Sequence, residues 1–210
     1  MTRRIILGSA SPSRKRLLES VNIDFEILVS GVDEENPEIT KLSPSEMVLA
    51  LAIMKAHTVK NLFDCGNNAL IIGCDSTFEF DGESLGKPGT RENAIARAKK
   101  ISGKSGLLHT GHCVIDTAQG IEVSDISTAR VHFAKMSDAE IENYVDSGEP
   151  LEVAGGFTLD GLSAPFITHI EGDPSGIIGL SLPTLRKAIL NLGLDWTEVS
   201  PAMKKEQVRA

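Results

Sequence analysis

Ala69-Leu70-Ile71-Ile72-Gly73-Cys74 is a short apolar run that ends at the charged residue Asp75. Apolar runs of this length without an alternating pattern are typical of strands buried on both faces, as in the middle of an α/β sheet. We therefore expect a central strand here. It should deliver Asp75 at its C-terminal end, where functional side chains gather in such sheets.

Segments typical of strands and helices alternate on both sides of this run. Arg4 to Leu7 is typical of a second buried strand, and a turn of small residues leads from it into a helix over about residues 13–21. Further strands are predicted at 25–29, 107–116 and 122–133, and helices at 43–61, 90–102, 137–145 and 183–192. Asp81-Gly82 predicts a two-residue hairpin turn. The alternation indicates an α/β fold, and the turn at 117–120 adds an antiparallel portion to the sheet.

The overall charge and the lengths of the apolar segments exclude several classes of protein. The chain has 210 residues, with 21 basic and 29 acidic side chains and a formal net charge of −8. This charge argues against a large nucleic acid or an anionic membrane as a partner. No apolar run approaches the roughly 18 residues that span a bilayer, and three cysteines without a CxxC pair indicate reduced thiols. We expect a cytoplasmic protein, with one domain of two lobes over residues 1–200 and a frayed tail at 201–210.

Two local patterns mimic well-known sites but lack a necessary part. Gly103-Lys104-Ser105 ends like a phosphate-binding P-loop, but Ala98 stands inside a predicted helix where that motif needs a glycine. His109 and His112 are spaced like a pair of metal ligands, but in a strand this spacing places them on opposite faces. We therefore interpret His109 and His112 as core or surface histidines rather than metal ligands.

The segment from Ser9 to Arg14 has the properties of a phosphate-binding turn. Its small residues allow backbone N–H groups to approach a ligand, and the helix that follows presents its positive end. Ser9 can donate a hydroxyl hydrogen bond, and Arg14 can bind phosphate oxygens with a bidentate fork. The alternative is an ordinary turn between strand and helix with solvated arginines.

Two acidic residues and two lysines complete the candidate site. Glu34 and Asp75 follow two different predicted strands and supply hard oxygen ligands of the kind that hold Mg²⁺ or Mn²⁺, although either side chain could simply be solvated. Lys55 lies late in an apolar helix, and Lys87 is held between Gly86 and Pro88. A metal, nearby cations and a group that orients water are the parts that phosphoryl transfer needs.

The order and spacing of these motifs resemble the Maf family of nucleoside triphosphate pyrophosphatases, also described as septum formation inhibitor Maf-like proteins. The resemblance runs from about residue 5 to residue 192. It includes Leu7-Gly8-Ser9-Ala10-Ser11-Pro12-Ser13-Arg14, Val32-Asp33-Glu34, Lys55-Ala56, Ile72-Gly73-Cys74-Asp75-Ser76, Leu85-Gly86-Lys87-Pro88 and Ala154-Gly155-Gly156-Phe157, with further matches at 81–82, 144–150, 161 and 178–180.

The resemblance implies an elongated, mixed β-sheet flanked by helices, with two lobes and a central cleft, like the inosine triphosphatase fold. It implies hydrolysis of a nucleoside triphosphate between the α- and β-phosphates, with Asp75 as the proton acceptor. In that family the cleft is lined by residues that correspond to Ser9, Arg14, Glu34, Lys55 and Lys87. A homodimer and a role in clearing surplus or modified nucleotides are further expectations.

Mapped onto this chain, Asp75 and Glu34 would hold the divalent cation, either Mg²⁺ or Mn²⁺, and Asp75 would take a proton from the attacking water. Arg14, Lys55 and Lys87 would neutralise the triphosphate and the departing pyrophosphate.

Two departures from the family pattern concern the substrate. Many relatives have two consecutive arginines where this chain has Ser13 and Arg14, so one phosphate contact is either lost or supplied by Lys15 or Arg16. Relatives that prefer thymidine and uridine nucleotides carry Tyr and Gln at Phe157 and Asp160. The segment 171–174 is closer to the branch that prefers 7-methylguanosine triphosphate. Phe157 could stack on a base while Asp160 accepts hydrogen bonds from it, and the preferred base stays open.

A nucleotide-sensing protein that regulates cell division without turnover is the alternative function. The septum association of the family and the loss of one arginine at Ser13 motivate it. Release of pyrophosphate over many turnovers distinguishes the enzyme from the sensor.

Overall fold

A computed structural model describes residues 3–34, 36–62 and 68–200. Within these residues, seven strands form one sheet: β1 (Arg4–Leu7), β2 (Glu26–Ile27), β3 (Ala69–Phe80), β4 (Glu83–Leu85), β5 (Ser105–Asp116), β6 (Ile121–Phe133) and β7 (Ile167–Glu171). The order is β2-β1-β3-β5-β6-β7, and β4 also pairs with β3. β1 is parallel to β2 and β3, whereas all other pairs are antiparallel. The predicted mixed sheet is confirmed, and the predicted tail at 201–210 lies outside the described residues.

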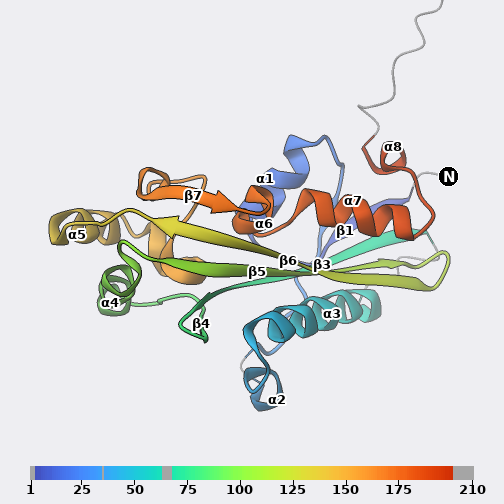
Figure 1. The fold of residues 1–210 in the computed structure, drawn as a ribbon. Helices are drawn as coiled ribbons and strands as arrows, with labels where there is room; N and C mark the ends of the chain where they lie inside the picture. Colours follow the sequence, from blue (N-terminus) through green and yellow to red (C-terminus); the bar gives the residue numbers. More distant parts are fainter. Residues whose placement is uncertain (1–2, 35, 63–67, 201–210) are drawn as a thin grey trace, which may run out of the picture.

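Helices cover both faces of this elongated sheet. They are α1 (Pro12–Ser20), α2 (Pro37–Thr40), α3 (Pro44–Leu62), α4 (Arg91–Ile101), α5 (Asp138–Asp146), α6 (Pro174–Ile178), α7 (Leu182–Asn191) and α8 (Trp196–Val199), with 3₁₀ turns at Glu149–Glu152, Ala154–Gly156 and Ala164–Phe166. In Figure 1, α3 lies along one face, α1 and α7 lie on the opposite side, and α4 and α5 stand at one end. No helix among the described residues combines the length and the hydrophobicity that a membrane crossing requires.

Local signals place the helix starts correctly. The Thr90 side chain accepts a hydrogen bond from the Asn93 N–H at the start of α4. Ser137 and Glu140 form the expected capping box at the start of α5. The Asp81-Gly82 turn joins β3 to β4, and both residues have positive φ, at 53° and 80°.

Strand β3 differs from the prediction in its length. We expected it to end at Cys74, but it continues through Asp75 to Phe80, so the expectation that Asp75 marks its C-terminal end is wrong. The cause is the long antiparallel pairing with β5, which extends from Leu70 to Glu79. On the other edge of β3, pairing with β1 stops at Ile72 and pairing with β4 begins at Phe78. Asp75 therefore lies beside a gap in the sheet between β1 and β4.

Other differences occur where local signals are weak. The strand expected at 25–29 is reduced to the two residues Glu26–Ile27. The irregular stretch after residue 154 contains β7 and α6, which the sequence did not predict.

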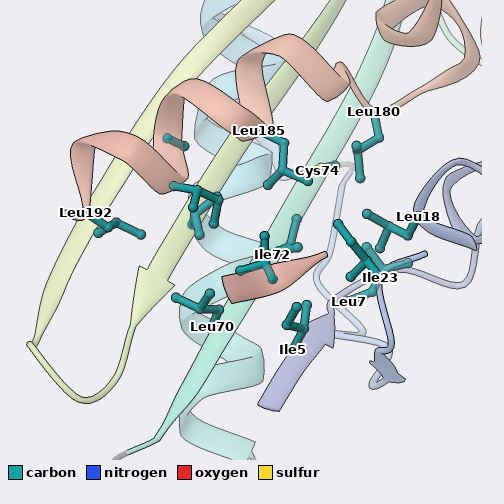
Figure 2. Packing of buried hydrophobic residues seen from close by; sticks show 14 of the residues in the cluster. Ile5, Leu7, Leu18, Ile23, Leu70, Ile72, Cys74, Leu180, Leu185 and Leu192 are labelled. Carbon is teal, nitrogen blue, oxygen red and sulfur yellow. The ribbon is translucent and has the colours of Figure 1, made fainter. Parts of the chain in front are cut away.

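Buried apolar side chains form separate clusters along the long strands. One cluster packs the first half of β3 against β1, α1 and α7, and Figure 2 shows its residues Leu7, Leu18, Leu70, Ile72 and Leu185 pointing toward one another. Another cluster surrounds Phe78, Phe133 and Phe157 at the far half of the strands. Two further clusters lie under α3 and between α4 and α5, and the division into two lobes stays a prediction.

Helix α3 lies unusually close to the sheet because the strands carry glycine beneath it. A Cβ atom on Gly73 would lie 2.3 Å from the Ala52 carbonyl oxygen, and one on Gly111 would lie 2.2 Å from the Val48 carbonyl oxygen. Any larger residue would push the helix away from the strands. The close contact places Lys55, one turn after Ala52, over the gap between β1 and β4.

The two histidines of β5 are confirmed as core residues. His109 contacts the Thr128 hydroxyl at 2.8 Å and the Glu79 carboxylate at 2.9 Å. On the opposite face, His112 is fully buried, and its Nε2 accepts a hydrogen bond from the Ser181 N–H at 2.8 Å. Burial, with a smaller contribution from the Arg14 guanidinium, lowers the pKa of His112 to about 4.

Gly111→Ala should lower the free energy of unfolding by about 1–3 kcal/mol, because the new methyl group meets the backbone of α3. Urea titration measures this change. Gly86→Ala is the matched control, since open space surrounds Gly86, and its stability should match the wild type. Equal stabilities of the two variants would contradict the close packing of α3.

Acid should destabilise the protein through His112. The unfolded chain binds a proton near pH 6.5 and the folded chain only near pH 4, so this contribution is complete above pH 6.5 and is lost as the pH falls. The loss amounts to about 3 kcal/mol between these values. Urea titrations from pH 7 to pH 4 should show a shallower decline for His112→Gln than for the wild type. Exposed His169, changed to Gln, should leave the wild-type decline unchanged.

Candidate functional site

A cleft of about 800 Å³ opens at the gap in the sheet between β1 and β4. Its walls come from the β1–α1 turn, α3, the middle of β3, and loops near residues 86, 153, 158 and 178. The cleft brings together all eight residues that the sequence nominated: Ser9, Arg14, Glu34, Lys55, Asp75, Lys87, Phe157 and Asp160.

Lys55, Asp75 and Glu34 form the charged centre of the cleft. The Lys55 Nζ atom lies 2.6 Å from an oxygen of Asp75 and 2.6 Å from an oxygen of Glu34. Lys55 and Asp75 are buried, at 7% and 8% exposure, whereas Glu34 is exposed. Two carboxylates from separate segments therefore converge on one ammonium group.

The pKa of Asp75 is raised because burial penalises its charged form. The nearby carboxylate of Glu34 raises this pKa further, while Lys55 and Arg14 oppose the shift. A carboxylate with a raised pKa is a stronger base than an ordinary aspartate. The adjacent ammonium favours the ionised form that can accept a proton.

Arg14 is buried at the start of α1, where Ser11 caps the helix. Its guanidinium donates to the Ser9 hydroxyl at 2.9 Å, to the Ser76 hydroxyl at 3.1 Å and to the Gly179 carbonyl at 2.7 Å. Among the described residues, no carboxylate lies within ion-pair distance of this guanidinium. A buried cation whose bonding partners are all neutral favours an anionic ligand. The positive end of α1 adds to this preference.

Ser76 and Thr110 are site residues that the sequence reasoning missed. The Ser76 hydroxyl contacts the Thr110 hydroxyl at 2.9 Å, and Thr110 donates to the Gly176 carbonyl at 2.8 Å. These bonds hold the Ser76 hydroxyl, which lines the cleft and accepts from Arg14. Strand alternation could have placed Ser76 on the face opposite to Asp75, but nothing in the sequence signals its bond to Arg14.

The remaining nominated residues lie around the rim and the far wall. Lys87 is exposed and its Nζ lies 3.6 Å from a carboxylate oxygen of Glu152. Asp160 forms an ion pair with Arg16 at 2.9 Å, and Arg16 also donates to the Ser13 hydroxyl at 3.0 Å. Lys15 pairs with Glu19 at 3.7 Å, and whether Lys15 or Arg16 supplies a phosphate contact stays a prediction.

Phe157 has little free surface in this structure. Its ring packs edge to face against Phe78 and Phe133, with centroids 5.1 Å and 4.9 Å away, and it is 5% exposed. Such packing makes Phe157 part of the second hydrophobic core as well as of the cleft wall. Stacking of Phe157 on a ligand stays a prediction.

The donor set at the centre fits a divalent cation that also binds phosphate. Glu34 and Asp75 offer hard oxygen atoms, which Mg²⁺ and Mn²⁺ prefer. Within the described residues, no group of three or more His, Cys, Asp or Glu side chains is arranged to hold a metal. The cation would therefore take its other ligands from water and from phosphate oxygens.

Comparison with known proteins identifies a family and several close relatives that cover most of the chain. A family model described as Maf-like protein matches residues 4–192. A nucleoside triphosphate pyrophosphatase of Streptomyces coelicolor is 51% identical over 197 residues, which cover 94% of each chain. Relatives with the same name include those of Salinispora tropica, at 45% identity over 92% of this chain and 86% of the relative, and of Thermosynechococcus vestitus, at 46% over 92% and 96%.

Arg14→Gln should abolish binding of polyphosphate anions in the cleft, because it removes the buried positive charge. Inorganic tripolyphosphate at 100 times its Kd should stabilise the wild type by about 2.7 kcal/mol, and thermal unfolding measures this effect. Exposed Arg186, changed to Gln, lies outside the cleft and should keep the stabilisation. A full effect of tripolyphosphate on Arg14→Gln would exclude Arg14 as the anion contact.

Proposed function

Because the chain belongs to the Maf family and is a nucleoside triphosphate pyrophosphatase, we propose that its cleft hydrolyses the bond between the α- and β-phosphates. The products are a nucleoside monophosphate and pyrophosphate. The arrangement of Asp75 between Lys55 and the Arg14 network carries this proposal. It joins a buried base to positive charge in one cleft.

The triphosphate lies along the positively charged side of the cleft in this proposal. Ser9 and Arg14 bind phosphate oxygens at the start of α1, and Lys55 contacts the phosphate nearest to Asp75. Lys87, which lines the cleft, binds phosphate with its exposed ammonium in exchange for its ion pair with Glu152. Together these donors neutralise the charge that develops on the leaving pyrophosphate.

Asp75 accepts the proton of the attacking water. Its raised pKa makes it a better proton acceptor than a solvated aspartate. Lys55 orients the carboxylate through its bond to one Asp75 oxygen and leaves the other oxygen available to water. Lys55 is therefore both a phosphate ligand and a positioning residue for the base.

Glu34 and Asp75 would hold a divalent cation, Mg²⁺ or Mn²⁺. When bound, such a cation supplies additional neutralisation of the phosphate charge. Both carboxylates already meet at Lys55, which keeps their oxygens close together at the floor of the cleft.

The base lies against the segment from Phe157 to Asp160, which lines the cleft. Asp160 accepts hydrogen bonds from a donor edge of the base, in exchange for its ion pair with Arg16. We further expect a cytoplasmic homodimer with a single domain, in which the enzyme removes surplus or modified nucleotides. These are expectations that the family resemblance motivates.

Asp75→Asn should reduce turnover by at least about 10²-fold, because the amide cannot accept the proton. Pyrophosphate release from dTTP, UTP, CTP and 7-methyl-GTP, with Mg²⁺ or Mn²⁺, measures this loss and ranks the bases.

The thermal unfolding of the variant is the control for an intact fold. Full turnover by a folded Asp75→Asn protein would eliminate Asp75 as the base. Nucleotide binding by the wild type without pyrophosphate release would instead favour a nucleotide sensor.

A further inference from the structure

Glu149 holds the segment from Phe157 to Ser163 from behind the cleft. One carboxylate oxygen accepts a hydrogen bond from the Thr158 hydroxyl at 2.7 Å. Both oxygens accept from the Leu162 N–H at 3.0 Å. A single side chain thus fixes two points of the loop that carries the residues facing the base.

The loop is also closed on itself around Ser163. The Thr158 N–H donates to the Ser163 hydroxyl at 2.7 Å, and this hydroxyl donates back to the Thr158 carbonyl at 2.6 Å. Ser163 is 3% exposed, so water does not compete for these bonds. Together with the bonds from Glu149, they hold the loop at three residues.

The space between Glu149 and the loop tolerates no additional atom. A Cβ atom on Gly161 would lie 2.5 Å from a Glu149 carboxylate oxygen and 2.3 Å from the Thr158 hydroxyl oxygen. Such tight packing means that a shift of the carboxylate must move the loop.

Glu149 itself takes no part in lining the cleft, whereas Phe157, Thr158, Leu159 and Asp160 all do. Its effect on a ligand must therefore act through the loop. The tip of the loop reaches α1 through the ion pair between Asp160 and Arg16. Glu149 holds the loop on both sides of Asp160, at Thr158 and Leu162. The spacing between Asp160 and the phosphate-binding turn therefore depends on the Glu149 carboxylate.

We propose that Glu149 is a positioning residue that sets base selectivity by fixing Phe157–Asp160 against the cleft. The inference rests on the proposed function and deepens it. The groups that bond to Glu149 are both donors, so the site requires an acceptor at each carboxylate oxygen. Glutamine keeps the shape but places an NH₂ donor beside one of these donors.

Glu149→Gln tests this role. The ratio of kcat/KM between the best and the worst of UTP, dTTP, CTP and 7-methyl-GTP should fall about tenfold, the equivalent of one charge-assisted hydrogen bond. The change should appear in KM more than in kcat, because the catalytic residues are untouched. The inhibition constant of pyrophosphate should stay within about twofold of the wild type, since Glu149 bonds to Thr158 and Leu162 and to none of the proposed phosphate ligands.

Glu142→Gln on α5 is the matched control, because it makes the same chemical change at an exposed position outside the cleft. It should keep the wild-type selectivity. Thr158→Val removes the hydroxyl that Glu149 binds and should shift the selectivity in the same direction. The double variant should be no worse than Glu149→Gln alone, because both changes remove one contact.

The same ratios are measured as Kd values by calorimetry, which separates this inference from the proposed function. Nucleotide binding by the wild type without turnover would refute the proposed hydrolysis, while the Kd ratios would still test Glu149. Unchanged ratios in both Glu149→Gln and Thr158→Val would overturn the positioning role. An equal loss for every base would do the same, since it would indicate a purely structural residue.

Discussion

The contact between helix α3 and the sheet at Gly73 and Gly111 is the constraint on which the site depends. Without side chains at these positions, the helix backbone lies directly on β3 and β5. Lys55 then reaches Asp75, two residues beyond Gly73 on the same face of the strand. A helix held at an ordinary distance would leave Asp75 buried without its cation, a costly arrangement for a carboxylate. The packing of two glycines thus decides the chemistry of the base.

The cleft and its charge have a common origin in the short length of β1. Because β1 ends at Leu7 and β4 begins only opposite Phe78, the middle of β3 has a free edge that a ligand can approach. The turn that follows β1 starts α1 at this edge and buries Arg14 there. Sheet topology therefore places the positive side of the cleft next to the acidic side.

Local patterns predicted the longer helices α1, α3, α4, α5 and α7, the hairpin turn and the paired strands β5 and β6, because caps and turn residues act over a few positions. They failed for the position of Asp75 within β3, which depends on where a distant strand stops pairing. The order of the sequence motifs, compared with the Maf family pattern, identified eight residues that line the cleft. The bond from Arg14 to the Gly179 carbonyl joins residues 165 positions apart, so no local pattern could signal it. The burial of Phe157 among other phenylalanines was hidden for the same reason.

The strands β3, β5 and β6 are each 12 or 13 residues long and run continuously along the length of the sheet (Figure 1). Relative movement of the two ends of the sheet must therefore twist this hydrogen-bonded sheet, which resists deformation far more than a flexible hinge. The spacing between the groups on either side of the cleft is set before any ligand arrives. Little binding free energy is then lost to rearrangement of the protein. More of it remains to stabilise the charge that develops at the reacting phosphate.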